Sequence, residues 1–306
     1  MTLHFGVKLC DAFCPIIEIE FVGNEKVLSM KNKNQTMNPA PLHTVKDLND
    51  IFDLFPRKGL VVLVGSPGSG KSIFALNLIE SALLNNPSTA ALIFSLGRSS
   101  KEVLDLMAHS MSEITAWKFD PENLSGREAA RFKKARKSIE KLPLLIRDGA
   151  RSVKDICATA HTINDIILKQ NDKMHFGAIL VDYVEGIEPS DKSKGRTFQI
   201  GECIMRLKIL SEELEVPIIL LAGLNRKNFY EPKVDNLMWA EEIKKYADTI
   251  ALLSYREIPI PTASRKKIRH KIRLNIVNLS ENSCTSIPLI FKRSSLRYIP
   301  EYGSLD

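Results

Sequence analysis

The residues best suited to chemistry form a glycine-rich run between an apolar segment and a helix-forming segment. The run reads Gly65, Ser66, Pro67, Gly68, Ser69, Gly70, Lys71 and Ser72. Its spacing matches the pattern Gly-x4-Gly-Lys-Ser, in which glycines let successive backbone N–H groups face one set of phosphate oxygens. Lys71 is expected to contact the β- and γ-phosphates of ATP, and the Ser72 hydroxyl to bind Mg²⁺. The alternative interpretation is an ordinary glycine turn.

A carboxylate suited to the same metal ends the apolar run within residues 177–186. Asp182 follows the segment Gly-Ala-Ile-Leu-Val. In a parallel sheet the carboxyl end of such a strand lies beside the phosphate loop, where an acid holds the water shell of Mg²⁺. We therefore predict Lys71 and Asp182 as catalytic residues, and Ser72 and Asp182 as metal ligands. Because Asp also ends many strands in turns, a purely structural role is the alternative.

These side chains need a sheet whose strands end at one edge. Continuous apolar runs predict strands at 60–64, 90–95, 143–147, 178–182, 217–222 and 249–254. Amphipathic runs between them predict helices near 71–84, 99–110, 126–141, 152–170 and 197–215. This alternation is typical of an α/β fold with a mostly parallel sheet that helices cover on both faces. After residue 255 the pattern changes, and two more strands are predicted near 271–279 and 286–291.

The chain is predicted to have three parts. Two β-like runs around Gly23 and Asn24 predict a short β-hairpin within residues 1–30. The polar, proline-containing residues 31–43 predict a linker. The remaining residues, 44–306, are expected to form one large α/β domain.

Composition narrows the class of protein. The 306 residues include 43 Lys or Arg against 36 Asp or Glu, and the net charge of +7 favours a polyanionic partner. The five cysteines lack metal-ligand spacing, which is typical of a reduced cytoplasmic protein and argues against a zinc site. The longest apolar run, residues 216–224, is too short to span a bilayer. We therefore expect a cytoplasmic protein that has no membrane contact.

Several stretches together resemble the DnaB-type replicative DNA helicases, which are ring-shaped motors with a RecA-like fold. The likeness covers roughly residues 44–295 and includes GSPGSGKSIFALNL, IFSLGRS, LVDYVEG, RLKILSEELEVPIILLAGLNR and YADTIALLSYR. The resemblance implies a RecA-like P-loop NTPase core that binds ATP and Mg²⁺. It also implies a hexameric ring that moves along single-stranded DNA in DNA replication.

The chain departs from this family at catalytic positions. Gly97 stands where the family has the glutamate that activates water, because IFSLGRS is similar to the family's FSLEMS. Gly223 stands where it has a glutamine that senses the γ-phosphate, and Ser280 falls where its arginine finger is expected. Glu102 and Glu185 are candidate replacement bases. The alternative is that both are solvated surface acids.

Three arginines are candidate replacements for the missing cations. Arg226 belongs to the retained Leu-Asn-Arg and is predicted to contact the nucleotide. Arg98 and Arg256 also follow predicted strands. A solvent-facing charge at a strand end is the alternative for each of them.

Basic segments are candidates for DNA contact. In the resembled family the loop after the metal-site strand lines the ring channel, and here that loop carries Lys192, Lys194 and Arg196. The alternative is a solvated loop. The helix predicted over 126–142 has a basic face opposite an apolar one, and the basic tract 265–273 is expected to form a loop between two strands.

Two functions are consistent with these residues. The first is an ATP-dependent DNA helicase motor that binds ATP–Mg²⁺ and single-stranded DNA as a homo-oligomeric hexamer. The second is a degenerate, non-hydrolysing paralogue that binds nucleotide and joins a mixed ring with an active helicase as an assembly or regulatory partner. Loss of a general base typically lowers the rate by about 10²–10⁴-fold. Another RecA-fold ATPase, of the recombination or clock type, is a third interpretation.

Overall fold

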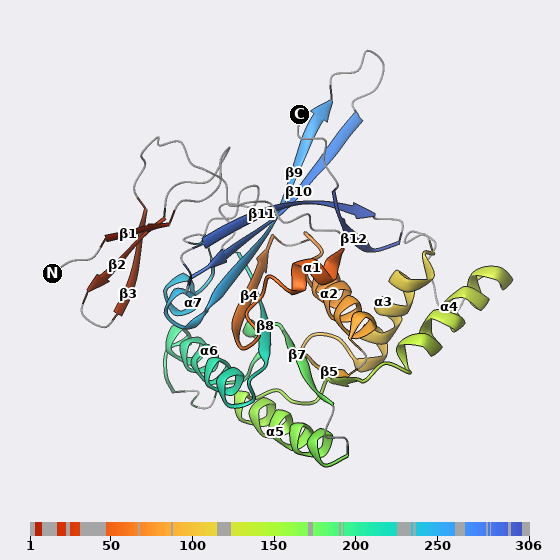
Figure 1. Cartoon of the computed structure of the whole chain (residues 1–306), viewed down its shortest axis with the longest axis horizontal. Coiled ribbons are helices and arrows are strands. Elements are labelled where there is room, and N and C mark those ends of the chain that lie inside the picture. Colours follow the sequence, from red (N-terminus) through yellow and green to blue (C-terminus); the bar gives the residue numbers. More distant parts are fainter. Residues whose placement is uncertain are drawn as a thin grey trace.

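A mixed sheet organises the protein, with its described strands in the order β12-β11-β10-β9-β4-β8-β7-β5-β6 (Figure 1). The structure is a computed structural model. It describes residues 47–301 except 67, 87, 115–123, 171–173, 190, 192, 225–233, 235–236, 261–266, 280, 282 and 293–294. Only the backbone is described for residues 4–7, 17–22, 25–30, 170, 256–260 and 267–271.

The central part of the sheet is parallel, as the sequence predicts. Its strands are β4 (Gly59–Gly65), β5 (Thr89–Ser95), β6 (Leu144–Arg147), β7 (His175–Asp182), β8 (Pro217–Ala222) and β9 (Thr249–Ile260). The strand β8 lies between β4 and β7, although it follows both of them in the sequence. The carboxyl ends of β4, β8, β7 and β5 therefore meet at one edge of the sheet.

Helices cover both faces of this sheet (Figure 1). They are α1 (Leu48–Phe52), α2 (Lys71–Asn85), α3 (Ser100–Ser112), α4 (Gly126–Ile139), α5 (Val153–Gln170), α6 (Arg196–Glu213), α7 (Ala240–Tyr246) and the short 3-10 helix η2 (Val184–Gly186). Within the described residues, no helix combines the length and the apolarity needed to cross a membrane.

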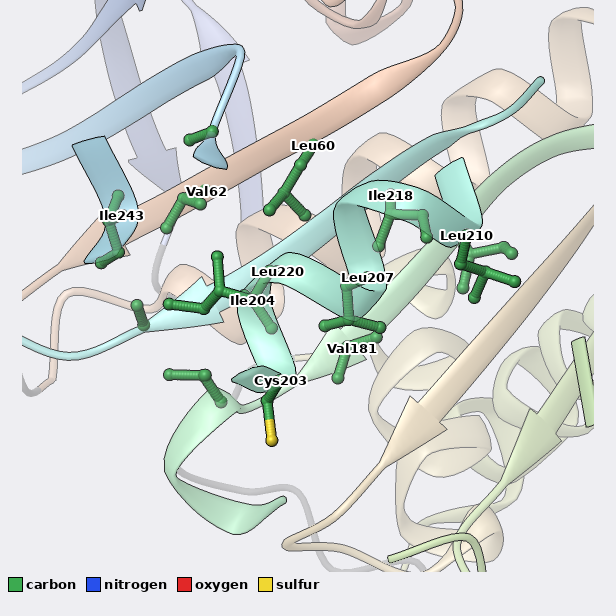
Figure 2. Packing of buried hydrophobic residues seen from close by; sticks show 14 of the residues in the cluster. Leu60, Val62, Val181, Cys203, Ile204, Leu207, Leu210, Ile218, Leu220 and Ile243 are labelled. Atoms are coloured by element: carbon green, nitrogen blue, oxygen red, sulfur yellow. The ribbon is translucent and has the colours of Figure 1, made fainter. Parts of the chain in front are cut away.

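The core has two halves because β4 sends alternate side chains to opposite faces. Leu60 and Val62 pack with residues of α5, α6 and α7, whereas Val61 and Leu63 pack with residues of α1, α2 and α3. Figure 2 shows the first half, where Ile204 of α6 lies among the apolar side chains of neighbouring strands. A strand that is buried on both faces reads as a continuous apolar run, which is why the sequence predicts these strands well.

Beyond β9 the sheet continues in antiparallel strands. They are β10 (Lys267–Asn278), β11 (Ser283–Lys292) and β12 (Arg297–Pro300). The two strands predicted in this region are present and are longer than expected, and β12 was not predicted. The expectation of a loop over the basic tract 265–273 is wrong from residue 267 onward, because those residues pair with β9 along their length.

The N-terminal segment forms a separate antiparallel sheet of β1 (His4–Val7), β2 (Ile17–Val22) and β3 (Glu25–Met30). The strands β2 and β3 pair with each other as the predicted hairpin requires. Its turn residues, Gly23 and Asn24, lie outside the described residues, and so does the predicted linker, 31–43. The boundaries of the three predicted parts stay a prediction.

Candidate functional site

The glycine-rich loop joins the end of β4 to the start of α2. Gly68 and Gly70 both have φ +79°, a left-handed conformation that favours glycine. A Cβ added at Gly65 would lie 2.5 Å from the Ser69 hydroxyl oxygen, so a side chain there would collide with the loop. Gly70 begins α2 without a side-chain cap, and the first N–H groups of the helix are therefore left for a ligand.

A buried tyrosine from the far end of the chain supports this loop. The hydroxyl of Tyr298, on β12, donates a hydrogen bond to the Ser69 carbonyl oxygen. A Cβ at Gly70 would lie 2.7 Å from the same hydroxyl oxygen. The fully buried Tyr298 ring packs edge-on against Phe74 at 5.2 Å and stacks on Phe291 at 4.5 Å. No local sequence pattern marks this residue, because its partners lie in a distant part of the sequence.

A polar cluster fixes β12 against α2 below the loop. The Tyr298 backbone N–H donates to Asn77 Oδ1 at 3.0 Å. Arg297 Nη2 lies 2.5 Å from Oε1 of Glu80, whose side chain is buried. Burial raises the pKa of Glu80 above its usual 4.5, and the Arg297 charge opposes that rise. These bonds hold Tyr298 in the position from which it reaches the loop.

Asp182, the carboxylate predicted to bind Mg²⁺, already has a cationic partner within the chain. Asp182 ends β7, and its Oδ2 lies 3.5 Å from Nη1 of Arg98. The Asp182 side chain is 16% exposed and that of Arg98 is 45% exposed. The Ser95 hydroxyl donates to the Arg98 carbonyl oxygen at 2.7 Å, and the Leu96 N–H donates to the Asp182 carbonyl oxygen at 2.8 Å. The turn that carries Arg98 is therefore fastened to the ends of β5 and β7.

The two glycines at the sheet edge face residues that follow β7. A Cβ at Gly97 would lie 3.3 Å from Cε1 of Tyr183, and a Cβ at Gly223 would lie 3.1 Å from Oε1 of Glu185. That carboxylate oxygen also accepts a hydrogen bond from the Gly223 N–H at 3.0 Å. Glu185 is partly buried. Its carboxylate is bonded to the backbone and occupies the space that a side chain at 223 would need.

Glu102, the other candidate base, caps α3. Its carboxylate accepts hydrogen bonds from the Ser99 N–H and the Ser99 hydroxyl, both at 2.7 Å. The Ser99 hydroxyl oxygen in turn accepts from the Glu102 N–H at 3.3 Å, which completes a capping box. These hydrogen bonds hold the pKa of Glu102 below its usual 4.5. A carboxylate so engaged is a weak proton acceptor, so the structure supports a local structural role.

The loop predicted to contact DNA is partly bound into the fold. Lys194 Nζ lies 4.1 Å from the ring centroid of Phe198, which is 54% exposed. Arg196 Nη2 donates to the Glu185 carbonyl oxygen at 2.9 Å, and Gln199 Nε2 donates to the Lys194 carbonyl oxygen at 2.6 Å. Arg196 therefore braces the loop, whereas the Lys194 ammonium and the Phe198 ring face solvent.

The basic helix α4 has the two faces that the sequence predicts. Phe132, Ala135 and Ile139 are buried, and Arg136 forms an ion pair with Asp105 of α3. The exposed side chains include Arg127, Arg131, Lys133, Lys134 and Lys137.

The carboxyl edge of the sheet brings most of the candidate residues together. The loop follows β4, Asp182 ends β7, Gly97 follows β5 and Gly223 follows β8. Lys71 and Ser72 begin α2, and no described residue forms an ion pair with the Lys71 ammonium. Pro67, Lys192, Arg226 and Ser280 lie outside the described residues, as does the side chain of Arg256.

Comparison with curated proteins finds replicative helicases. The chain is 29% identical over 256 residues to "Replicative DNA helicase DnaB" of Geobacillus stearothermophilus, an alignment that covers 82% of this chain and 54% of that protein. It is 29% identical over 210 residues to "Replicative DNA helicase DnaC" of Bacillus subtilis (strain 168), covering 66% of this chain and 44% of that protein. The chain therefore spans about half the length of the curated relatives it matches.

Comparison with solved structures supports the RecA-like fold. The protein in "The Structure Of A DnaB-Like Replicative Helicase And Its Interactions With Primase" superposes with a TM-score of 0.68 at 20% identity, covering 80% of this chain and 58% of that one. A KaiC-like protein, PH0186 from Pyrococcus horikoshii OT3, superposes with a TM-score of 0.51 at 17% identity, covering 81% and 91%. The family model described as "DnaB-like helicase C terminal domain" matches residues 43–299. The chain belongs to the DnaB-like helicase C-terminal domain family.

Proposed function

We propose that the chain is a DnaB-family motor subunit that binds ATP–Mg²⁺ at the loop between β4 and α2 and hydrolyses it slowly. The observation that carries this proposal is the loop itself, with its left-handed glycines and the uncapped start of α2. Successive N–H groups in such a loop bind phosphate oxygens, and the Lys71 ammonium adds charge to them.

The residues present also fit a magnesium ion. Hydroxyl and carboxylate oxygens are the ligands that Mg²⁺ prefers, and Ser72 and Asp182 supply one of each at the same sheet edge. When bound, the ion would neutralise phosphate charge. The chain's own residues would hold the triphosphate through the loop amides and Lys71, and would orient it along the start of α2.

Slow hydrolysis follows from the two glycines. Neither Gly97 nor Gly223 has a side chain that could accept a proton or donate a hydrogen bond to a γ-phosphate oxygen. The nearby carboxylate of Glu185 is held by the Gly223 N–H. The absence of a general base alone corresponds to roughly 3–5 kcal/mol of barrier, or about 10²–10⁴-fold in rate.

Single-stranded DNA is the proposed polymer partner, and a hexameric ring the proposed assembly. The loop before α6 supports this part of the proposal, because it presents the Lys194 ammonium next to the exposed ring of Phe198. A cation and an aromatic ring together suit a phosphate and an unstacked base. Lys192 and Arg226, which lie outside the described residues, are kept as proposed contacts to DNA and to nucleotide.

A second candidate function is a non-hydrolysing subunit that joins a mixed ring with an active helicase. The specific observation in its favour is that Glu185 fills the space next to Gly223, with Oε1 only 3.1 Å from where a Cβ on residue 223 would lie. Such a subunit would bind nucleotide without turning it over, and would contribute to assembly or regulation.

The test is calorimetric binding of ATP with Mg²⁺ together with phosphate release, each with and without single-stranded DNA. Wild type should bind, whereas Lys71→Ala should not. Lys58→Ala is the matched control, because this exposed lysine pairs with Glu215 away from the loop. No affinity of the wild-type chain for ATP–Mg²⁺ would refute the proposed function. Brisk DNA-stimulated hydrolysis would eliminate the second candidate, and co-purification with an active helicase without phosphate release would support it.

A further inference from the structure

The turn between β5 and α3 places a positive charge next to the acid expected to face a metal ion. Arg98 is the one charged residue among residues 95–99. Its guanidinium lies 3.5 Å from the carboxylate of Asp182, which is largely buried. Asp182 therefore has a cationic partner before any nucleotide arrives.

The backbone around Arg98 keeps this cation within reach. The Ser95 hydroxyl holds the Arg98 carbonyl, and the next residue, Ser99, is locked by its capping box with Glu102. The side chain itself is half exposed, so it has room to move without disturbing the core. Because the backbone of Arg98 is held while its guanidinium can move, another cation could replace the guanidinium at Asp182.

We propose that Arg98 competes with Mg²⁺ for Asp182, so that nucleotide binding by this chain depends little on a divalent cation. This inference rests on the proposed function, because it concerns the same nucleotide site. A divalent cation reaches Asp182 only when Arg98 leaves it. While Arg98 stays, the carboxylate is already neutralised, and the triphosphate is held by the loop amides and Lys71.

The competing explanation is that the pair is a surface contact that Mg²⁺ displaces at no cost. Exposed ion pairs are often worth little, but those that do contribute reach a factor of about 5 in an equilibrium constant. The Arg98 side chain is half exposed, whereas the Asp182 side chain is mostly buried. This pair is therefore intermediate between a fully exposed ion pair, which contributes little, and a buried one. A comparison of metal dependence between variants decides which explanation holds.

The experiment measures the dissociation constant for ATP in Mg²⁺ and in EDTA, for wild type and for Arg98→Met. Wild type is expected to bind in EDTA within about threefold of its affinity in Mg²⁺. Arg98→Met is expected to show a metal dependence about fivefold larger, since Asp182 is then left unpaired. Arg57→Met is the matched control, because this exposed arginine forms no ion pair with a described residue.

Arg98→Lys provides a second variant that keeps the charge, and it should stay close to wild type. Equal metal dependence in wild type and Arg98→Met overturns the inference, whatever its size. A wild-type chain that binds ATP in Mg²⁺ but loses about tenfold or more in EDTA overturns it as well, and leaves the proposed function standing. Failure of wild type to bind ATP in either buffer refutes the proposed function itself.

Discussion

The support of the glycine-rich loop by Tyr298 can be tested by removing a single oxygen atom. In Tyr298→Phe the ring keeps its contacts with Phe74 and Phe291, so no cavity forms. Removing the hydroxyl takes away the hydrogen bond that it donates to the Ser69 carbonyl oxygen. Because that carbonyl is held from a fully buried side chain, water cannot simply take the place of the hydroxyl.

The expected magnitude follows from the cost of an unsatisfied buried acceptor. That cost is about 1–3 kcal/mol. In a domain of this size each kcal/mol lowers the melting temperature by about 2–4 °C, so the fall should be about 2–12 °C. The hydroxyl also holds the loop in the conformation that is proposed to bind phosphate. If about 1 kcal/mol of this preorganisation is lost, ATP binding weakens roughly fivefold.

Thermal unfolding and ATP titration of the same preparation check both effects. Tyr246→Phe is the matched control, because its hydroxyl forms no hydrogen bond with a described residue. Unchanged stability and unchanged affinity in Tyr298→Phe would show that the proposed support of the loop is wrong. Lower stability with wild-type affinity would limit Tyr298 to a role in folding.

Three further predictions concern other parts of the chain. Gly97→Glu should supply a general base and raise the rate of ATP hydrolysis toward the lower end of about 10²–10⁴-fold. The side chain can be accommodated if the Tyr183 ring moves by a few tenths of an ångström. Phosphate release is the measurement, and Gly97→Gln is the control. Burial lowers the pKa of His109 below its usual 6.5. The unfolded chain then binds more protons below that pH, so stability present at pH 7 should be lost as the pH falls through the folded-state pKa, and His109→Gln should flatten this decline in urea titrations. Lys194→Gln should weaken single-stranded DNA binding and reduce the salt slope by about 0.7 in a log–log plot, and an unchanged slope would exclude this ammonium as a phosphate contact.

The sequence predicts the buried strands well and the peripheral ones poorly. The strand predicted over 217–222 coincides with β8, because a strand buried on both faces reads as an unbroken apolar run. The sequence predicts that the strand starting at 249 ends at 254, whereas β9 continues to Ile260. Its extension depends on pairing with β10, which a local pattern does not report. The short strand β12 was missed for the same reason.

In the candidate site, too, residues that belong to a local sequence pattern are predicted, whereas contacts between distant parts of the sequence are not. The loop and the strand end at Asp182 are predicted because each has a local pattern of glycines or apolar residues. The contacts of Tyr298 with the loop and of Glu185 with Gly223 join residues that are far apart in the sequence. The sequence indicates Arg98 as a candidate cation, but its pairing with Asp182 depends on the neighbouring positions of β5 and β7. Such contacts follow from the strand order, which no single segment encodes.

The position of Glu185 has a mechanical consequence. Its carboxylate holds the backbone at the end of β8, and its carbonyl oxygen holds the guanidinium of Arg196 at the start of α6. One residue thus joins the end of β8 to the loop before α6, which are the proposed nucleotide and DNA surfaces. If the proposed function is correct, a displacement of that loop would be transmitted to the end of β8 through these two hydrogen bonds.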